Sequence, residues 1–367
     1  MSGSRVALTG HRWEMRAPGE LARVADVPFE PGPGEACVRV VGCGVCHTDL
    51  GYLYDGVRPK HELPLALGHE VSGEVVAVGD GAEEWLGRAV IVPAVTPCGE
   101  CASCRAGRGQ ICPRQVMPGN DIQGGFASHL IVPARGLCHV DVPGALEGKT
   151  LGKSNCTLAE LSVVADALTT PYQAVLRSGL AENDFAIVIG LGGVGGFAAQ
   201  IAKAFGATVV GIDVNAQKLA ALEPFGLDLA LDASQLDAKA IKAQLRDYAK
   251  QHGIPAVGWR IYECSGTAPG QELAWNLLCH GAFLSVVGFT MDRVSVRLSN
   301  LMAFDATAQG NWGCLPENYA GALQLVLDGK VALKPFVEVH PLEDIRRVME
   351  DVHAHRLNKR AVLVPNR

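Results

Sequence analysis

Two different rhythms of hydrophobic and polar residues divide the chain. Up to about residue 142, short apolar runs such as CVRVVGCGVC, HEVSGEVVAVG and RAVIVPAV are broken by glycine and proline. Such runs predict the strands of a turn-rich β domain. Beyond residue 157, apolar runs such as FAIVIG (185–190) and TVVGID (208–213) alternate with helical stretches such as VGGFAAQIAKAF. This alternation predicts a parallel sheet that is covered by helices on both faces.

The second rhythm continues through WRIYECSG and AFLSVVG, and the order becomes less clear after about residue 300. VLVP near the end predicts a strand that returns to the first domain. We therefore expect an α/β protein with a β-rich domain over residues 1–165 and a doubly wound, Rossmann-type domain over residues 166–305. Residues 306–367 are expected to return to the first domain.

Length and composition narrow the class of protein. With 367 residues, of which 48% are hydrophobic and 19% charged, the chain suits two ordinary soluble domains. No apolar run reaches the roughly 18–20 residues that cross a bilayer. The start, MSGSRVALTGHRW, lacks the apolar segment of a secretion signal, so we expect a cytoplasmic protein. The net charge of −6 disfavours nucleic acids and anionic membranes as partners.

Four of the 12 cysteines fall in one short loop. Cys98, Cys101, Cys104 and Cys112 form the pattern C-x2-C-x2-C-x7-C within residues 97–113. Four thiolates hold zinc in a closed tetrahedral site without a position for substrate, so the loop predicts a structural zinc. Three alternatives remain: reduced cysteines without metal, an iron–sulfur cluster, and a nucleic-acid zinc module, which the negative charge disfavours.

A second candidate metal site lies upstream, in GCGVCHTD (42–49) and LGHE (67–70). Cys46 and His69 would supply one thiolate and one imidazole, a mixture suited to a zinc ion that keeps an open position. Taken singly, Cys46 is more often a small buried hydrophobe and His69 a core histidine. Together with the cysteine loop and the coenzyme motif described next, they predict a catalytic zinc.

A glycine-rich motif, GLGGVG, stands between an apolar strand and a helix. In this context the glycines let backbone N–H groups reach a pyrophosphate at the helix N-terminus. Asp213 ends the next strand, where a carboxylate accepts a ribose 2′-hydroxyl and repels a 2′-phosphate, so NAD is predicted over NADP. The alternative for Asp213 is a solvated strand end. The motif supplies these coenzyme-binding candidates: Gly190, Gly192, Gly193, Val194 and Gly195.

The order of GCGVCHTD, LGHE, the cysteine loop, GGFASH and GLGGVG resembles that of the zinc-containing medium-chain alcohol dehydrogenases over essentially the whole chain. The resemblance implies a GroES-like catalytic domain, a Rossmann domain, NAD and two zinc ions per chain. It makes Cys46 and His69 zinc ligands, with Glu70 as a nearby carboxylate that can approach or replace a ligand. Thr48 matches the hydroxyl that hydrogen-bonds the substrate alcohol, and Asp49 the carboxylate that orients the ligand histidine.

The chain departs from the family pattern at two positions. In relatives a cysteine or glutamate, the third zinc ligand, stands six residues before a tyrosine; here Asp166 precedes Tyr172. A carboxylate binds zinc well, so Asp166 is the expected ligand, although its short side chain leaves a water-bridged contact or ligation by Glu70 open. Many relatives have a relay histidine three residues after Thr48, where this chain has Gly51, so the proton relay must end differently.

The resemblance adds three weaker coenzyme contacts. His47 and Arg360 match positions that face the pyrophosphate, and Lys218 matches a helix residue that flanks the adenosine ribose. The alternative for each of the three residues is an ordinary charged side chain on the surface.

The resemblance also implies hydride transfer from an alcohol carbon to nicotinamide, with zinc as Lewis acid. Stretches such as DLGYLYDGVRPKHELPLALGHE, SVVADALTTPYQAV and RLSNLMAFDATAQGNWG are similar to those of enzymes that oxidise 6-hydroxycyclohex-1-ene-1-carbonyl-CoA in anaerobic benzoate degradation. This implies an alicyclic enoyl-CoA alcohol as the small-molecule substrate. Candidate CoA contacts, otherwise a solvated face, are Arg58, Lys60, Arg293 and Arg297.

Two other functions stay open. A general zinc alcohol or aldehyde dehydrogenase with a non-CoA substrate would share every motif except the substrate-pocket stretches. A catalytically silent NAD-binding protein would have no need of the open zinc site that Cys46, His69 and Thr48 imply. We expect a homo-oligomer, either a dimer or a tetramer.

Overall fold

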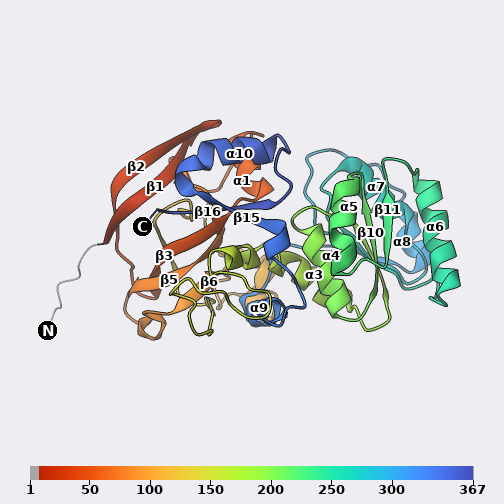
Figure 1. The fold of residues 1–367 in the computed structure, drawn as a ribbon, viewed down its shortest axis with the longest axis horizontal. Helices are drawn as coiled ribbons and strands as arrows, with labels where there is room; N and C mark the ends of the chain where they lie inside the picture. Colours follow the sequence, from red (N-terminus) through yellow and green to blue (C-terminus); the bar gives the residue numbers. More distant parts are fainter. Residues whose placement is uncertain (1–7, 367) are drawn as a thin grey trace. The chain divides into compact units, whose positions relative to one another are not determined.

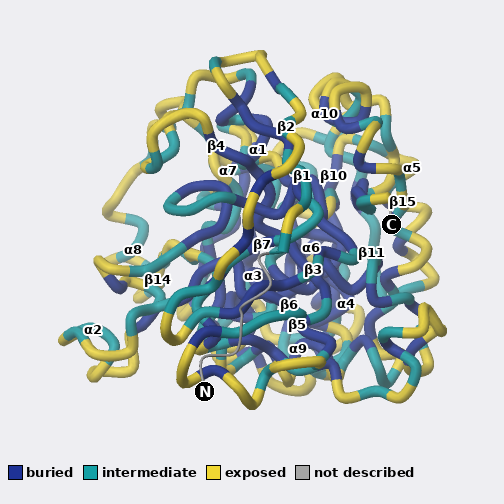
Figure 2. The backbone as a smooth tube through the Cα atoms, turned by 90° about the vertical axis from the view of Figure 1, so that its left-hand side faces the viewer, coloured by how far each residue is buried: buried dark blue, intermediate teal, exposed yellow. Residues whose placement is uncertain are grey.

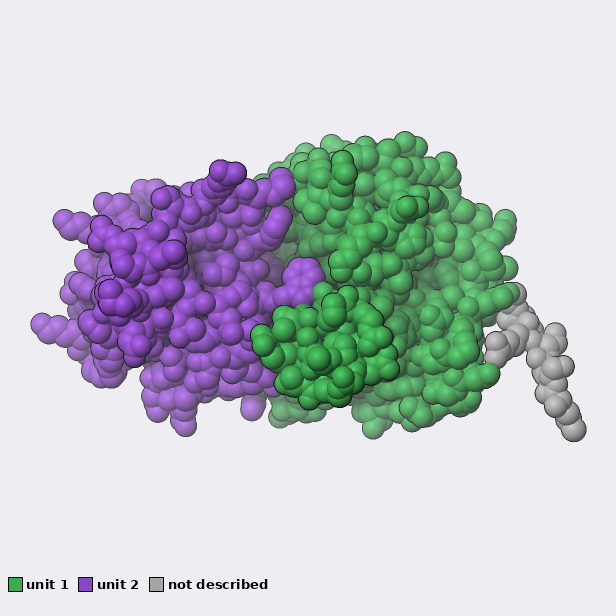
Figure 3. Space-filling model, turned by 180° about the vertical axis from the view of Figure 1, so that it is seen from behind, with its two compact units in different colours: residues 1–169, 313–329, 333–367 green, residues 170–312, 330–332 purple. Residues whose placement is uncertain are grey.

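The computed structural model describes residues 8–366; residues 1–7, at the start of the predicted β-rich domain, lie outside the described part. The chain forms two compact units, which Figure 3 colours separately. Unit 1 consists of Met1–Thr169, Gly313–Gly329 and Leu333–Arg367, and unit 2 of Thr170–Trp312 and Lys330–Ala332.

Unit 1 is built on two mainly antiparallel sheets. One has the strand order β2-β1-β4, and the other has the order β15-β16-β3-β5-β6-β8, with β7 paired to β3. Apolar residues of these strands form the main core of the unit, and a smaller cluster gathers around Val27, Phe29 and Cys37. The strands are β1 (Leu8–Ala17), β2 (Glu20–Phe29), β3 (Glu35–Gly44), β4 (Leu65–Ala66), β5 (Glu70–Val78), β6 (Ala89–Val92), β7 (His129–Pro133), β8 (Cys138–His139), β15 (Val337–Pro341) and β16 (Arg360–Val364).

Short helices connect and cover these sheets. Helix α10 turns Ile345, Val348 and Met349 into the core of unit 1, whereas α2 has no buried residue. The helices of this unit are α1 (His47–Leu53), α2 (Ala102–Arg105), α9 (Tyr319–Leu327) and α10 (Ile345–His353). The 3-10 turns are η1 (Glu83–Trp85), η2 (Gly109–Ile111), η3 (Glu160–Ala165), η5 (Pro316–Asn318), η6 (Lys334–Phe336) and η7 (Leu342–Asp344).

Unit 2 is a six-stranded parallel sheet in the order β11-β10-β9-β12-β13-β14. The order reverses between β9 and β12, which is where doubly wound sheets bind their ligands. The strands are β9 (Phe185–Ile189), β10 (Thr208–Asp213), β11 (Leu229–Asp232), β12 (Arg260–Glu263), β13 (Phe283–Val286) and β14 (Thr307–Gly310). Strands β9 and β10 occupy the positions that the apolar runs predicted.

Helices flank this sheet, and α4 and α5 pack on β10 (Figure 1). The helices and turn are α3 (Thr169–Ser178), α4 (Gly195–Ala204), α5 (Ala216–Leu222), η4 (Glu223–Phe225), α6 (Ala238–Gln251), α7 (Ala268–Asn276) and α8 (Ser299–Phe304). Strand β9 is buried throughout. Helix α8, which Figure 2 labels, has no buried residue. The predicted α/β class, a β-rich part plus a parallel-sheet part, is confirmed. Within residues 8–366, no helix has the length and apolarity needed to span a membrane.

Candidate metal and coenzyme sites

A buried aspartate shapes the turn that carries the first candidate ligand. Strand β3 ends at Gly44, and Cys46 follows in extended conformation as the N-cap of α1. The backbone N–H of Cys46 donates to Oδ2 of Asp49, and the N–H of Gly68 donates to Oδ1, both at 3.0 Å. The Asp49 side chain is fully buried. One carboxylate therefore fixes both the Cys46 turn and the backbone just before His69.

His69 immediately precedes β5 and Glu70 is the first residue of that strand, which pairs with β3. In this register Glu70 lies opposite Gly44. A Cβ atom added to Gly44 would lie 2.1 Å from Oε2 of Glu70, so only glycine leaves room for the glutamate side chain. Gly44 is thus needed to make room for a second buried carboxylate, that of Glu70, beside His69.

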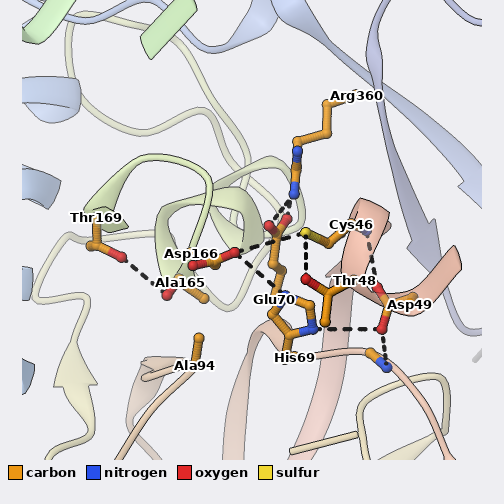
Figure 4. A network of polar contacts seen from close by, with 12 residues as sticks. Cys46, Thr48, Asp49, His69, Glu70, Ala94, Ala165, Asp166, Thr169 and Arg360 are labelled. Atoms are coloured by element: carbon orange, nitrogen blue, oxygen red, sulfur yellow. Dashed lines mark hydrogen bonds and ion pairs between the residues drawn. The ribbon is translucent and has the colours of Figure 1, made fainter. Parts of the chain in front are cut away.

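Four possible metal ligands from three segments meet at this point (Figure 4). Ligand atoms of Cys46, His69, Glu70 and Asp166 all lie within 4.8 Å of one another. Oδ2 of Asp166, which follows η3, is 3.4 Å from Nε2 of His69 and 3.8 Å from Sγ of Cys46. The Oγ1 atom of Thr48 is 3.7 Å from the same Sγ atom. The residues that the motifs singled out separately are therefore neighbours.

The surroundings of His69 indicate that these four side chains suit a bound cation. The ring is 1% exposed, and within residues 8–366 neither ring nitrogen has a hydrogen-bond partner of good geometry. Burial lowers the pKa of His69, but Asp49, Asp166 and Cys46 together raise it well above its usual value. A buried imidazole without hydrogen bonds, among acidic side chains, is what a metal ligand looks like before the metal is added. One thiolate, one imidazole and a carboxylate fit zinc.

Glu70 is already engaged by an arginine. Nε of Arg360 donates to Oε2 of Glu70 at 2.9 Å, and the terminal guanidinium nitrogen pairs with Oε1. Figure 4 shows this ion pair, and both side chains are buried. Burial raises the pKa of Glu70, while Arg360 opposes the shift. No motif pointed to this ion pair, because its partners are brought together only by the pairing of β16 with β3. The contact of Arg360 with a pyrophosphate stays a prediction.

The cysteine loop has the spacing of a tetrahedral thiolate site. Sulfur–sulfur distances are 3.5 Å for Cys101–Cys104, 3.7 Å for Cys101–Cys112 and 3.9 Å for Cys98–Cys104. Four sulfurs at about 2.3 Å from one zinc ion would lie about 3.8 Å apart. The backbone N–H of Glu100 lowers the pKa of Cys98 to about 6, which favours the thiolate that binds metal. The loop therefore fits a structural zinc ion.

The glycine loop leads from β9 into α4 with little space around two of its glycines. Gly190 has a positive φ of 82°, and a Cβ there would lie 2.4 Å from Cα of Ser265. A Cβ on Gly195 would lie 1.7 Å from the carbonyl oxygen of Gly190. An added Cβ on Gly192 would meet no described atom within 4 Å. Gly190 and Gly195 make the tight turn, whereas the backbone at Gly192 is open, as the predicted pyrophosphate contact requires.

Asp213 at the end of β10 is tied directly to the glycine loop. Its Oδ2 atom accepts the N–H of Leu191 at 2.6 Å, and Oδ1 accepts the N–H of Asn215 at 2.8 Å. Sequence spacing pointed to a ribose partner but not to this second role. Lys218 lies in the first turn of α5, where its backbone N–H donates to the Asn215 side chain.

The structure also shows the surroundings of the remaining candidates. His47 is exposed, and its ring stacks on that of His355 with the centroids 6.1 Å apart. Gly51 lies within α1. Among the proposed CoA contacts, Lys60 forms an ion pair with Asp121 at 3.1 Å. Arg58 also belongs to unit 1, and Arg293 and Arg297 are exposed residues of unit 2.

Comparisons with known proteins bear on the family to which the chain belongs. The model of the alcohol dehydrogenase GroES-like domain matches residues 32–143, and that of zinc-binding dehydrogenases matches residues 193–328. D-arabinose 1-dehydrogenase (NADP(+)) of Saccharolobus solfataricus is 31% identical, over 92% of each chain. An alcohol dehydrogenase of Geobacillus stearothermophilus is 29% identical, over 90% of this chain and 91% of its own. The structure of Geotrichum candidum acetophenone reductase in complex with NAD has a TM-score of 0.81 at 25% identity and covers 98% of each chain.

The chain therefore belongs to the zinc-dependent medium-chain alcohol dehydrogenase family. It is an oxidoreductase that acts on a CH–OH group, and its cofactors are zinc and a nicotinamide dinucleotide. The predicted family, the GroES-like and Rossmann architecture and the enzyme class are confirmed.

Proposed function

We propose that the chain oxidises a secondary alcohol with NAD, at a catalytic zinc held by Cys46, His69 and Asp166. The observation that carries the proposal is the position of Oδ2 of Asp166, 3.4 Å from Nε2 of His69 and 3.8 Å from Sγ of Cys46. Glu70 is assigned a place beside the metal, because both of its oxygens pair with Arg360. The cysteine loop is proposed to hold the second, structural zinc.

When bound, the zinc would supply a Lewis acid and NAD a hydride acceptor. Within the chain, Asp49 lies 3.5 Å from Nδ1 of His69 and orients the ring. Thr48 is proposed to hydrogen-bond the substrate hydroxyl and to pass its proton outward. Gly51 has no side chain to continue that path, so the proton passes to water or to another side chain. Asp213 is proposed to accept the ribose 2′-hydroxyl and so to favour NAD over NADP.

For the substrate, we propose 6-hydroxycyclohex-1-ene-1-carbonyl-CoA, with the 6-oxo thioester as product. The support is the similarity of long stretches, of which DLGYLYDGVRPKHELPLALGHE includes Arg58 and Lys60. Cationic side chains of this kind recognise the phosphates of CoA. The competing proposal is a general alcohol dehydrogenase that acts on a non-CoA substrate. The similarity to relatives that are named alcohol dehydrogenase supports this alternative.

The experiment is NADH formation by the zinc-loaded enzyme with a matched set of alcohols. The set contains the cyclic hydroxy-enoyl-CoA thioester, the same ring as its free acid, and simple primary and secondary alcohols. The proposal expects efficient turnover of the thioester alone. Equal kcat/KM with the free acid or with simple alcohols would favour the general dehydrogenase. No NADH from any alcohol, in protein that contains two zinc ions, would favour a silent coenzyme-binding protein.

A further inference from the structure

A buried glutamate at the carboxyl end of β12 has no part in the chemistry described above. Oε1 of Glu263 accepts hydrogen bonds from the backbone N–H groups of Ser265, at 2.8 Å, and Gly266, at 3.2 Å. The same oxygen accepts a bond from the Ser265 hydroxyl. Oε2 is buried without a hydrogen-bond partner of good geometry in the described part of the chain. Burying a carboxyl group in this way costs free energy, so its presence here needs a structural or functional explanation.

The segment that Glu263 shapes packs directly on the coenzyme loop. A Cβ on Gly190 would lie 2.4 Å from Cα of Ser265, and a Cβ on Gly195 would lie 3.0 Å from Cβ of Cys264. The first and last glycines of the motif therefore touch residues 264–265 without spare room. Because the contact at Gly190 is backbone against backbone, a shift of Ser265 is passed straight to the coenzyme loop.

The same hydrogen bonds continue into helix α7. The Ser265 hydroxyl lies 3.0 Å from Oγ1 of Thr267 and accepts the backbone N–H of Thr267 at 3.2 Å. Thr267 is the N-cap of α7, and its hydroxyl accepts the N–H of Gly270 at 3.2 Å. One buried carboxyl oxygen thus begins a chain of bonds that fixes the turn between β12 and α7.

We propose that Glu263 is a positioning residue for the coenzyme, holding residues 264–267 against Gly190 so that the glycine loop keeps the shape that receives the pyrophosphate. Without this acceptor, the two backbone N–H groups would be left unsatisfied, and the turn would rearrange to find partners. The inference rests on the coenzyme-binding role proposed for the glycine loop.

The role requires an acceptor at Oε1 and not a negative charge. Burial raises the pKa of Glu263 because it disfavours the charged form, whereas the hydrogen bonds from Ser265 and Gly266 act in the opposite direction. The amide of glutamine presents an oxygen at the same distance along the side chain. Aspartate keeps the charge but is one methylene shorter, and alanine has no acceptor. The three substitutions therefore separate reach from charge.

The test is the Kd for NADH, measured by fluorescence titration of the full-length, zinc-loaded protein. We expect Glu263→Ala and Glu263→Asp to weaken binding at least about tenfold, and Glu263→Gln to stay within about twofold of the unmodified protein. All three should keep the zinc content of the unmodified protein. The matched control is Asp184→Ala, at the opposite end of β9, where the carboxylate accepts the N–H of Ala181 at 2.9 Å. That variant should leave the Kd unchanged even if it lowers the melting temperature.

Two results would overturn the inference: NADH binding that is unchanged in Glu263→Ala, or equal losses in Glu263→Gln and Glu263→Ala. If Glu263→Ala does not fold, the comparison of Glu263→Asp with Glu263→Gln decides in the same way. Failure of the unmodified protein to bind NADH would instead overturn the proposed coenzyme site itself, and this inference with it.

Discussion

Nε2 of His69 lies 3.4 Å from Oδ2 of Asp166, although one residue precedes β5 and the other follows η3. The aspartate side chain is therefore long enough to approach the imidazole, and a longer glutamate is not needed at this position. The same oxygen is 3.8 Å from Sγ of Cys46, so the three donors face one point. This relationship supports a Cys/His/Asp zinc site in a family whose usual third ligand is cysteine or glutamate.

The two cysteine groups should respond differently to substitution. Cys46→Ser should abolish turnover and leave the fold intact, because Cys46 is a proposed ligand of the catalytic zinc and not of the structural zinc. Cys101→Ser should lower the melting temperature by at least about 5 °C, because structural zinc binding is coupled to folding. Zinc analysis, thermal unfolding and NADH formation check both variants. Iron with sulfide in the unmodified protein, or an unchanged melting temperature in Cys101→Ser, would speak against these assignments.

Substitution of two glycines in the coenzyme loop should have different effects on stability and on NADH binding. Gly195→Ala would place a Cβ 1.7 Å from the Gly190 carbonyl oxygen, so overpacking should cost about 1–3 kcal/mol of stability. Gly192→Ala meets no described atom within 4 Å, so it should fold normally and yet lose NADH affinity, because the methyl group occupies ligand space. Chemical unfolding and NADH titration separate the two effects. Normal NADH affinity in Gly192→Ala would contradict the assigned pyrophosphate site.

Asp213 should set the choice of coenzyme. Asp213→Gly removes the charge that repels a 2′-phosphate, so the ratio of kcat/KM for NAD to that for NADP should fall by at least about tenfold. It also removes the acceptor of the Leu191 N–H, so affinity for both coenzymes should decrease. Steady-state kinetics with each coenzyme measure both effects. Equal efficiency with NAD and NADP in the unmodified enzyme would show that Asp213 does not act in this way.

Local patterns predicted those parts of the molecule that local sequence determines. The runs of β9 and β10 are short, buried at every apolar position and bounded by glycine or a polar end, so their positions followed from the sequence. Strand β14 reads TAQG and lies at the edge of the sheet, with its residues mostly exposed, so no hydrophobic pattern marks it. This is why the order after about residue 300 was unclear from the sequence.

The candidate site divides in the same way. Closely spaced cysteines and glycines in a fixed order revealed the cysteine loop, Cys46, His69 and the glycine motif. Three features depend on contacts between distant segments: the Glu70–Arg360 ion pair, the bond from Leu191 to Asp213, and the Glu263 turn beneath Gly190. A carboxylate at a strand end looks the same in sequence whether it faces solvent, a ribose or a backbone N–H group. Only the fold distinguishes these cases.

The zinc content of Asp166→Ala, measured beside that of Glu70→Ala, tests the central claim most directly. Asp166→Ala removes a proposed ligand, so we predict one zinc ion per chain and no single-turnover hydride transfer. Glu70→Ala removes the partner of Arg360 but no proposed ligand, so it should keep both zinc ions. Asp166→Cys should keep both zinc ions and turn over poorly, because thiolate makes the metal a weaker Lewis acid. Two zinc ions and near-normal rates in Asp166→Ala, with one zinc ion in Glu70→Ala, would reverse the ligand assignment.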